Sequence, residues 1–186
     1  MRKISVYNFL TLNGFFKGVN EDISWHTHGQ EEGEYAAQSA GAANILLFGR
    51  VTYEMMAGFW PTPMAMEMNP SLANEMNRSE KIVFSNSLVK ADWNNTRVIS
   101  GNIIEEIRKL KLTPGPDMTI LGSGSIVTQF ADAGLIDAYQ FMIDPVAIGQ
   151  GTPVFEGLQQ RLELRLTSSR IFRSGIVLLD YEPLTP

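Results

Sequence analysis

The chain has 186 residues, 44% of them hydrophobic and 19% charged, with a net charge of −5 and no cysteine. This length is enough for one compact domain with a sizeable core, and the lack of cysteine excludes disulfides and thiolate chemistry. The acidic balance argues against broad binding to nucleic acids or anionic membranes, which requires clustered Lys and Arg, and no apolar run approaches the ~20 residues of a membrane helix.

The N-terminal part of the chain predicts a strand followed by a glycine-rich segment. Residues 4–10 are rich in β-forming side chains, and Asn13 and Gly14 are a strong turn signal. Phe15 and Phe16 lie between this turn and Gly18. One interpretation is a mobile loop that covers a flat ligand, and the alternative is a hairpin that folds both rings onto the core. The charged N-terminus is not followed by a long apolar stretch, so we expect a cytoplasmic protein without a signal peptide.

Residues 20–30 form a polar, irregular segment that contains Trp25, His26 and His28. Two histidines are too few for a metal site without carboxylates, so the favoured interpretation is a solvated loop and we expect no metal. Trp25 is different, because a large aromatic side chain in a polar loop often stacks on a planar ligand or fills a gap. A helix is predicted over residues 31–43, where Glu32 and Glu34 either favour the helix N-terminus or place a carboxylate in a pocket.

Two further apolar strands are each followed by polar residues. Residues 44–48 lead into Gly49, Arg50, Val51 and Thr52, where the guanidinium offers a fork of donors to a phosphate and Thr52 can cap the next helix. Residues 81–84 lead into Ser85, Asn86 and Ser87, with Lys90 shortly after. These side chains suit a phosphate or a ribose, and the alternative is a plain turn.

The segment 118–132 predicts a strand, a glycine turn and a helix. Gly122, Ser123, Gly124 and Ser125 follow the apolar residues 120–121, and a helical apolar period begins at Ile126. The N-terminus of such a helix, with its unpaired N–H groups, suits a phosphate. The alternative is that both glycines only make a tight connection, because a glycine-rich turn alone is a weak signal.

The order of the elements predicts the fold class. Strands alternate with helices up to about residue 134, whereas the C-terminal third consists mostly of antiparallel strands. We therefore expect a single α/β domain over residues 1–186, with a mainly parallel sheet flanked by helices in three layers and an antiparallel C-terminal hairpin.

The three polar junctions together indicate a dinucleotide site. Ligands of open α/β sheets bind beyond the carboxyl ends of the strands, and three suitable junctions at one edge can hold several phosphates. The chain has neither a G-x-G-x-x-G motif with an acidic ribose ligand nor a P-loop lysine motif, so a standard Rossmann or NTPase site does not fit. Arg50 and Lys90 favour a 2′-phosphate, and hence NADPH over NADH.

Five segments resemble the dihydrofolate reductase-like family, in the branch similar to the C-terminal reductase domain of bacterial riboflavin biosynthesis. They are residues 1–18 (MRKISVYNFLTLNGFFKG), 46–54 (LLFGRVTYE), 81–88 (KIVFSNSL), 91–96 (ADWNNT) and 121–130 (LGSGSIVTQF). The resemblance covers nearly the whole chain. It implies a predominantly parallel sheet with an antiparallel C-terminal hairpin, NADPH as cofactor and a homodimer, for which the apolar C-terminal hairpin is the candidate interface.

The resemblance also implies roles for individual residues. Arg50 and Thr52 would contact the adenosine-side phosphates, Ser85 and Asn86 would flank the adenosine, and residues 122–126 would hold the pyrophosphate. Residues 13–18 would form the loop over the nicotinamide, with Phe9 near its ring. The residues expected to bind the cofactor are Phe9, Gly18, Gly49, Arg50, Val51, Thr52, Ser85, Asn86, Ser87, Lys90, Gly122, Ser123, Gly124, Ser125 and Ile126.

Substrate residues are less defined. Many relatives have Asp where Asn13 stands, the helix carboxylate of the folate-reducing members falls near Gly33 between Glu32 and Glu34, and the substrate residues of the riboflavin enzyme are not plainly present. The candidates are Asn13, Trp25, Glu32 and Glu34. We expect an NADPH-dependent reductase of a small heterocyclic or carbonyl substrate, not of dihydrofolate itself. The alternative is a catalytically inactive NADP(H)-binding module.

Overall fold

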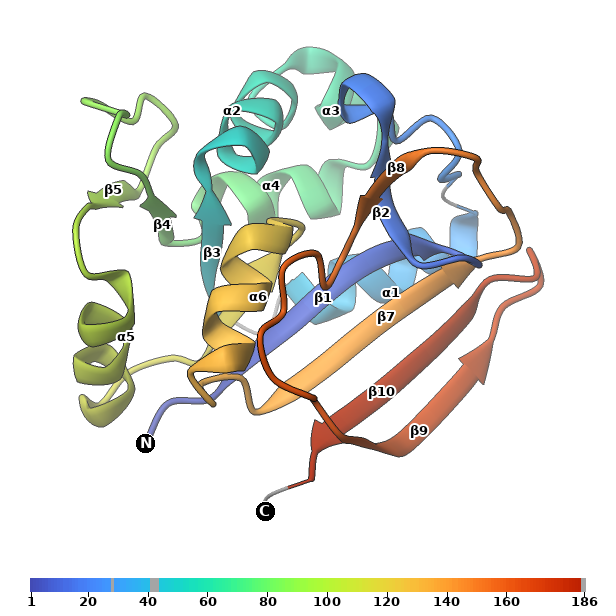
Figure 1. Ribbon diagram of the computed structural model, residues 1–186. Coiled ribbons are helices and arrows are strands. Elements are labelled where there is room, and N and C mark those ends of the chain that lie inside the picture. The colour runs from blue at the N-terminus through green and yellow to red at the C-terminus, as the bar shows by residue number, and fades with distance from the viewer. Residues whose placement is uncertain (28, 41–43, 185–186) are drawn as a thin grey trace.

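The computed structural model describes residues 1–27, 29–40 and 44–184, and it is built around one eight-stranded sheet (Figure 1). The strand order is β5-β4-β3-β6-β1-β7-β10-β9. The first six strands in this order pair in parallel, whereas β10 runs antiparallel to both β7 and β9. The strands of this sheet are β1 (Ile4–Thr11), β3 (Ile45–Gly49), β4 (Lys81–Phe84), β5 (Thr96–Ile99), β6 (Met118–Leu121), β7 (Ala138–Asp144), β9 (Leu164–Ile171) and β10 (Val177–Pro183).

Helices cover both faces of the sheet, as Figure 1 shows. They are α1 (Gln30–Ala40), α2 (Arg50–Phe59), α3 (Pro63–Met68), α4 (Pro70–Arg78), α5 (Ile103–Leu112) and α6 (Gly124–Asp132), with a short 3-10 helix, η1 (Val19–Glu21). The helix predicted over residues 31–43 is confirmed as α1, and its last predicted residues, 41–43, lie outside the described part, as does His28.

The core has two sides because successive side chains of a strand point to opposite faces. In β3, Ile45 and Leu47 pack on the side of α5 and α6, whereas Leu46 and Phe48 pack on the side of α1, α2 and α4. All four side chains are at most 3% exposed. The three-layer α/β arrangement expected from the alternation of strands and helices is therefore confirmed, and so is the antiparallel C-terminal hairpin.

The segment after β1 is a strand in this structure and not an irregular loop. β2 (Phe15–Gly18) pairs antiparallel with β8 (Gly151–Pro153), and the register shifts between Phe15 and Lys17. Phe16 packs against the core on the α6 side. The loop interpretation is therefore wrong for residues 15–18, because their backbone pairs with a distant segment that the local turn signals do not reveal.

The turn between β9 and β10 rests on the first turn of α1. The backbone N–H of Arg173 donates to Glu31 at 3.0 Å, and the hydroxyl of Ser174 donates to the carboxylate of Glu32. β9 itself is the edge strand, and seven of its eight residues are exposed. The hairpin is thus attached to the helix layer at one end while its outer strand remains open.

A buried lysine connects α4 to the start of β4. Lys81 has no exposed surface, and its ammonium donates to three backbone carbonyls, those of Asn77, Ser79 and Asn94, at 3.3, 2.7 and 3.0 Å. It also lies 4.4 Å from the ring centre of Trp93. Burial lowers the pKa of Lys81 to about 8. The side chain therefore ties together three backbone carbonyls from the end of α4 and from the segment before β5.

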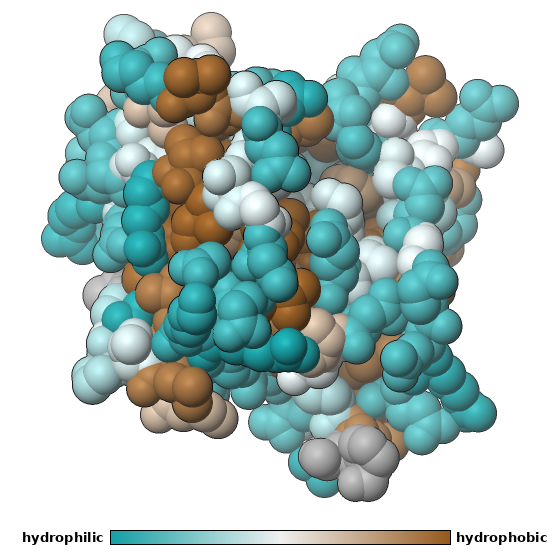
Figure 2. Space-filling view, turned by 60° about the vertical axis from the view of Figure 1, so that its left-hand side comes forward, coloured by the Kyte–Doolittle hydropathy of each residue, from teal (hydrophilic) through white to brown (hydrophobic). Residues whose placement is uncertain are grey.

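The surface is mostly hydrophilic on the face seen in Figure 2, where a band of apolar side chains runs beside a hollow. Val89 and Leu112 are among the apolar side chains that remain largely exposed, at 98% and 74%. Of the helices that the structure describes, none has the length and apolar character needed to cross a membrane.

Candidate functional site

The polar junctions predicted from the sequence lie on neighbouring strands. β4, β3, β6 and β1 are adjacent and parallel, so their carboxyl ends meet at one edge of the sheet. We call it the carboxyl edge. It carries the residues after Gly49, Phe84 and Leu121. The prediction that the three junctions share one edge is therefore confirmed by the topology.

Hydrogen bonds join the β3–α2 junction to the β6–α6 junction directly. The backbone N–H of Gly49 donates to Oγ of Ser123 at 2.9 Å, and this hydroxyl donates to the carbonyl of Leu121 at 3.1 Å. In return, the N–H of Ser123 donates to Oγ1 of Thr52 at 3.1 Å. The two hydroxyls therefore hold the backbone of both junctions in place, and they act as connectors more than as primary ligands of an anion.

The N-termini of α2 and α6 both open at this edge without a side-chain cap. Gly49, which has no side chain, precedes α2, and Ser123 precedes α6 without accepting a hydrogen bond from its first turn. In contrast, Thr62, Asn69 and Asn102 cap α3, α4 and α5. Since the first N–H groups of a helix have no acceptor inside the helix, two uncapped starts side by side present donors to an anion.

The glycine turn has the conformation that the sequence predicts. Gly122 has a φ of +57°, and a Cβ atom there would lie 3.0 Å from Cγ2 of Thr52. Ser123 is also left-handed, with a φ of 59°. A Cβ on Gly124 would lie 2.7 Å from the ring of Phe16, so this ring lies directly over the start of α6. The small residues are therefore required by close contacts at the turn.

A buried amide lies beside this turn. Asn8 is 2% exposed, and neither its amide nitrogen nor its oxygen has a hydrogen-bond partner in the part of the chain that the structure describes. It lies on β1 between Val6 and Leu10, whose side chains pack on the α6 side, and one residue beyond the Tyr7–Leu121 pair. An unsatisfied buried amide is costly, about 1–3 kcal/mol, so it marks a place where a polar ligand fits.

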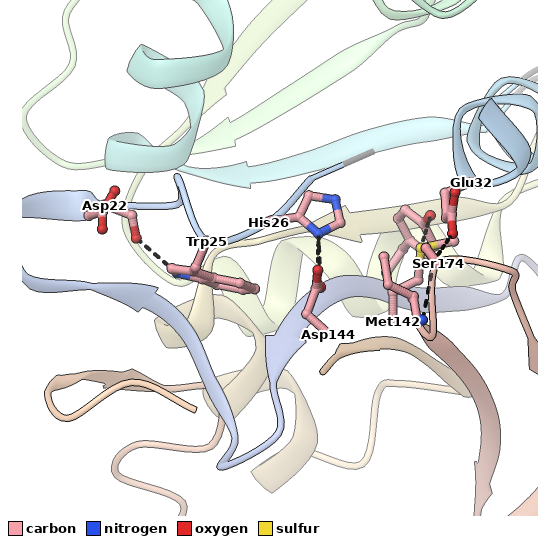
Figure 3. Close-up of polar contacts among 9 residues, drawn as sticks. Asp22, Trp25, His26, Glu32, Met142, Asp144 and Ser174 are labelled. Carbon is pink, nitrogen blue, oxygen red and sulfur yellow. Dashed lines mark hydrogen bonds and ion pairs between the residues drawn. The ribbon is translucent and has the colours of Figure 1, made fainter. Parts of the chain in front are cut away.

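On the other face, a histidine and a carboxylate meet at the ends of β1 and β7. Nδ1 of His26 lies 2.8 and 3.0 Å from the two carboxylate oxygens of Asp144, as Figure 3 shows. The His26 ring stacks on Phe9 at 3.7 Å between ring centres, and Trp25 meets its edge at 6.0 Å. The solvated-loop interpretation is therefore wrong for His26, whose side chain is only 5% exposed.

The two candidate carboxylates of α1 have different environments. Glu32 is 1% exposed and accepts a hydrogen bond from Ser174, whereas Glu34 is exposed and accepts from Nε2 of Gln30 at 3.0 Å. Burial, together with nearby Tyr35 and Glu32, raises the pKa of Tyr7, so its hydroxyl stays protonated. Of the two, Glu32 is buried and Glu34 is exposed, because two residues along a helix point to different sides, and a substrate role for either carboxylate stays a prediction.

Comparison with known proteins identifies the family. The sequence matches the RibD C-terminal domain over residues 2–178. The chain belongs to the RibD C-terminal domain family. The uncharacterized protein YyaP of Bacillus subtilis (strain 168) is 31% identical over 180 residues, which cover 97% of this chain and 94% of YyaP.

Solved structures share the fold of this RibD C-terminal domain. A protein of Shewanella sp. PV-4, named as a candidate riboflavin biosynthesis protein, has a TM-score of 0.77 at 18% identity and covers 98% of this chain and 99% of its own. Dihydrofolate reductase from Enterococcus faecalis, solved with NADP(H), has a TM-score of 0.66 at 16% identity, covering 97% and 96%. The fold is therefore dihydrofolate reductase-like.

Within this RibD C-terminal domain, the β4 junction uses its side chains locally. Oγ of Ser85 accepts from the N–H groups of Ser87 and Leu88 at 3.1 and 2.9 Å, and Oδ1 of Asn86 accepts from the N–H of Gly101 at 2.8 Å. These bonds correspond to the plain-turn alternative. The turn nevertheless lies next to the β3 junction on the carboxyl edge.

The two cations expected near a 2′-phosphate both have carboxylate partners. Arg50 bonds Glu54 at 2.8 Å, and Lys90 bonds Asp92 at 2.8 Å, with Lys90 82% exposed. Arg50 is the first residue of α2, so it lies directly at the joined junctions. Lys90 lies on the exposed segment after β4. Of the two, only Arg50 directly follows Gly49 at the joined junctions.

Asn13 and Gly18 have structural contacts in the β1–β2 connection. Nδ2 of Asn13 donates to the carbonyl of Ile148 at 2.8 Å, and its Oδ1 accepts from Oγ1 of Thr11 at 2.9 Å. Gly18 ends β2, and its N–H donates to the carbonyl of Asp22 at 2.7 Å. An aspartate at position 13 would lack the amide donor, which explains the asparagine in this chain.

Proposed function

We propose that this RibD C-terminal domain is an NADPH-dependent reductase that transfers a hydride to a small heterocyclic or carbonyl substrate, as in the riboflavin pathway. The observation that carries the proposal is the pair of uncapped helix N-termini, α2 and α6, at two junctions tied together by Ser123. The names of related proteins agree with a reductase: a Thermotoga maritima neighbour is a uracil reductase fused to a deaminase, and the Enterococcus faecalis neighbour was solved with NADP(H).

The residues at the carboxyl edge fit a dinucleotide. The first N–H groups of α2 and α6 would bind the phosphates. Because Gly122 has no side chain, it packs closely against Thr52 and leaves the backbone of the turn accessible to them. The unpaired amide of Asn8 offers one donor and one acceptor to a polar group of the ligand. Phe16, whose ring covers Gly124, would form the outer wall of the site.

Bound NADPH supplies the hydride, and the chain orients the reacting groups and excludes water. Phe9 would lie near the nicotinamide, on the face of the sheet that also carries His26, Asp144 and Glu32. The substrate would therefore lie between this face of β1 and α1, where Trp25 offers an aromatic edge.

Stopped-flow oxidation of NADPH against a panel of heterocyclic imines, aldehydes and ketones tests the proposal. We expect turnover with at least one class. NADPH binding without turnover on any substrate would instead support the inactive NADP(H)-binding module.

Arg50 gives a prediction on cofactor choice. If its guanidinium binds the 2′-phosphate, Arg50→Gln should weaken NADPH binding by about tenfold or more, the value of a charge-assisted hydrogen bond, and leave NADH binding unchanged. The matched control is Arg161→Gln. Arg161 is 85% exposed and precedes β9, the outer strand on the side of the sheet away from β3 and β4. Calorimetric titration with both cofactors measures the ratio, and an equal loss for NADPH and NADH would contradict the assignment.

We further propose that the domain forms a homodimer through the β9–β10 hairpin. An exposed edge strand is a ready template for pairing, and Leu166 and Ile171 of β9 are 51% and 77% exposed. The double variant Leu166→Lys/Ile171→Lys should sediment as a monomer, while Val89→Lys, at a 98% exposed position elsewhere, should remain a dimer. Sedimentation velocity measures this, and a monomeric wild type would refute the proposal.

A further inference from the structure

The pair formed by His26 and Asp144 is more buried than an ordinary loop contact. Both carboxylate oxygens lie within 3.0 Å of Nδ1, and the two side chains are only 5% and 3% exposed. A polar pair removed from water requires good geometry to persist, and here one ring nitrogen lies close to both carboxylate oxygens. Since a carboxylate can only accept a hydrogen bond, this position favours a proton on Nδ1 of His26.

The pair also lies where ligands bind in this fold class. Asp144 is the last residue of β7 and is in register with Thr11, the last residue of β1. β1 pairs in parallel with β6 on one side and with β7 on the other, so β7 is one strand further from the β6 junction. His26 reaches this point from the segment after η1 and stacks on Phe9, with 19° between the two ring planes. Ligands of open parallel sheets bind beyond these strand ends.

Three other ionisable side chains, those of Glu32, Tyr7 and Asp22, are less suited to deliver a proton, and Figure 3 labels Glu32 and Asp22 among them. Glu32 accepts a hydrogen bond from Ser174, and the hydroxyl of Tyr7 donates to the sulfur of Met142 at 3.3 Å. The remaining carboxylate, Asp22, accepts from the N–H of Ser24 in the exposed loop. An imidazole oriented by a carboxylate is the group best matched to proton transfer near neutral pH.

We propose that His26 is the proton donor of the reductase, that Asp144 is its positioning residue, and that the substrate is an aldehyde or ketone. This inference rests on the proposed NADPH-dependent function. The carbonyl carbon accepts the hydride and the carbonyl π electrons move to oxygen, which takes the proton from Nε2 of the His26 imidazolium. The products are an alcohol and NADP⁺, and the imidazole regains its proton from solvent.

The carbonyl class follows from acid–base chemistry. An imine nitrogen is basic enough to take a proton from water before the hydride arrives, whereas a carbonyl oxygen is not. A buried acid is therefore of most use where negative charge develops on oxygen in the transition state.

The test compares His26→Gln, His26→Ala and Asp144→Asn with Thr27→Ala, a variant of an exposed residue in the same loop. NADPH binding is measured by calorimetry, and turnover by NADPH oxidation with a panel of short aliphatic and aromatic aldehydes and ketones, and with heterocyclic imines for comparison. His26→Gln should lower kcat by about 100-fold or more, the usual worth of general acid catalysis, with NADPH affinity unchanged. Asp144→Asn should lower kcat while KM stays the same, and added imidazole should restore turnover to His26→Ala.

Each contrary outcome has a distinct meaning. A wild-type protein that binds no NADPH overturns the proposed function and this inference with it. A wild type that reduces imines but no carbonyl compound overturns only this inference. If His26→Gln lowers NADPH affinity and melting temperature together with kcat, and imidazole does not rescue His26→Ala, the pair is purely structural. That result would also overturn this inference.

Discussion

Replacing Gly122 with alanine is expected to weaken NADPH binding roughly tenfold, the effect of losing about 1.4 kcal/mol. The residue has a φ of +57°, which is unfavourable for alanine by about 1–2 kcal/mol. The new Cβ would also lie 3.0 Å from Cγ2 of Thr52, whose Oγ1 accepts the N–H of Ser123. Moving Thr52 would therefore loosen the bond that joins the two junctions.

Gly134 provides the matched control for this variant. Its φ is +63°, but a Cβ there meets nothing within 4 Å, so Gly134→Ala has the backbone cost without the contact. Gly134→Ala should lose about 1–2 kcal/mol of unfolding free energy in urea and Gly122→Ala at least as much, and only Gly122→Ala should lose NADPH affinity in a calorimetric titration. Equal NADPH affinity in the two variants would show that the turn does not form the cofactor site.

Replacing Lys81 with methionine should destabilise the protein by roughly 2–4 kcal/mol, because three hydrogen bonds from a charged donor are lost, at about 1.5–3 kcal/mol each, and solvent and relaxation recover part of the loss. The three carbonyls belong to Asn77, Ser79 and Asn94, and Lys81 has no exposed surface. Urea unfolding measures the loss. Lys109→Met is the control, since Lys109 is 62% exposed and should change the unfolding free energy by less than about 0.5 kcal/mol.

The pH dependence of the same variant has a defined sign. The folded pKa of Lys81 is lowered to about 8 from its ordinary 10.5, so the unfolded chain binds more protons at this position between these two values. The free energy of unfolding of the wild type, relative to Lys81→Met, should therefore rise with pH across this window. A difference in unfolding free energy between the two proteins that does not change with pH would contradict a lowered pKa of Lys81 in the folded state.

The carboxyl edge was predictable from the sequence because its signals are local. The turn residues around Gly49 and Gly122 directly follow apolar strands, and parallel strand ends meet at one edge. Which of Glu32 and Glu34 is buried could also be predicted from the sequence. Glu32 precedes the buried Ala36 by four residues, so the two share one face of α1, and Glu34 does not.

The remaining parts of the site depend on contacts between distant residues. His26 and Asp144 are 118 positions apart, and nothing in either local pattern indicates the other. The pairing of β2 with β8 also joins distant segments, so the turn signals around Gly14 left both a loop and a local hairpin open and did not indicate this partner. Asn8 was hidden for another reason, since a polar residue in a strand normally finds a partner and only the folded structure reveals that this one has none.

Calorimetric titration of the wild-type protein with NADPH tests directly whether the carboxyl edge binds the cofactor. We expect one saturable site per chain, together with a melting temperature that rises with NADPH concentration. A titration without heat of binding and an unchanged melting temperature at high NADPH concentration would contradict the assignment of the carboxyl edge as a cofactor site.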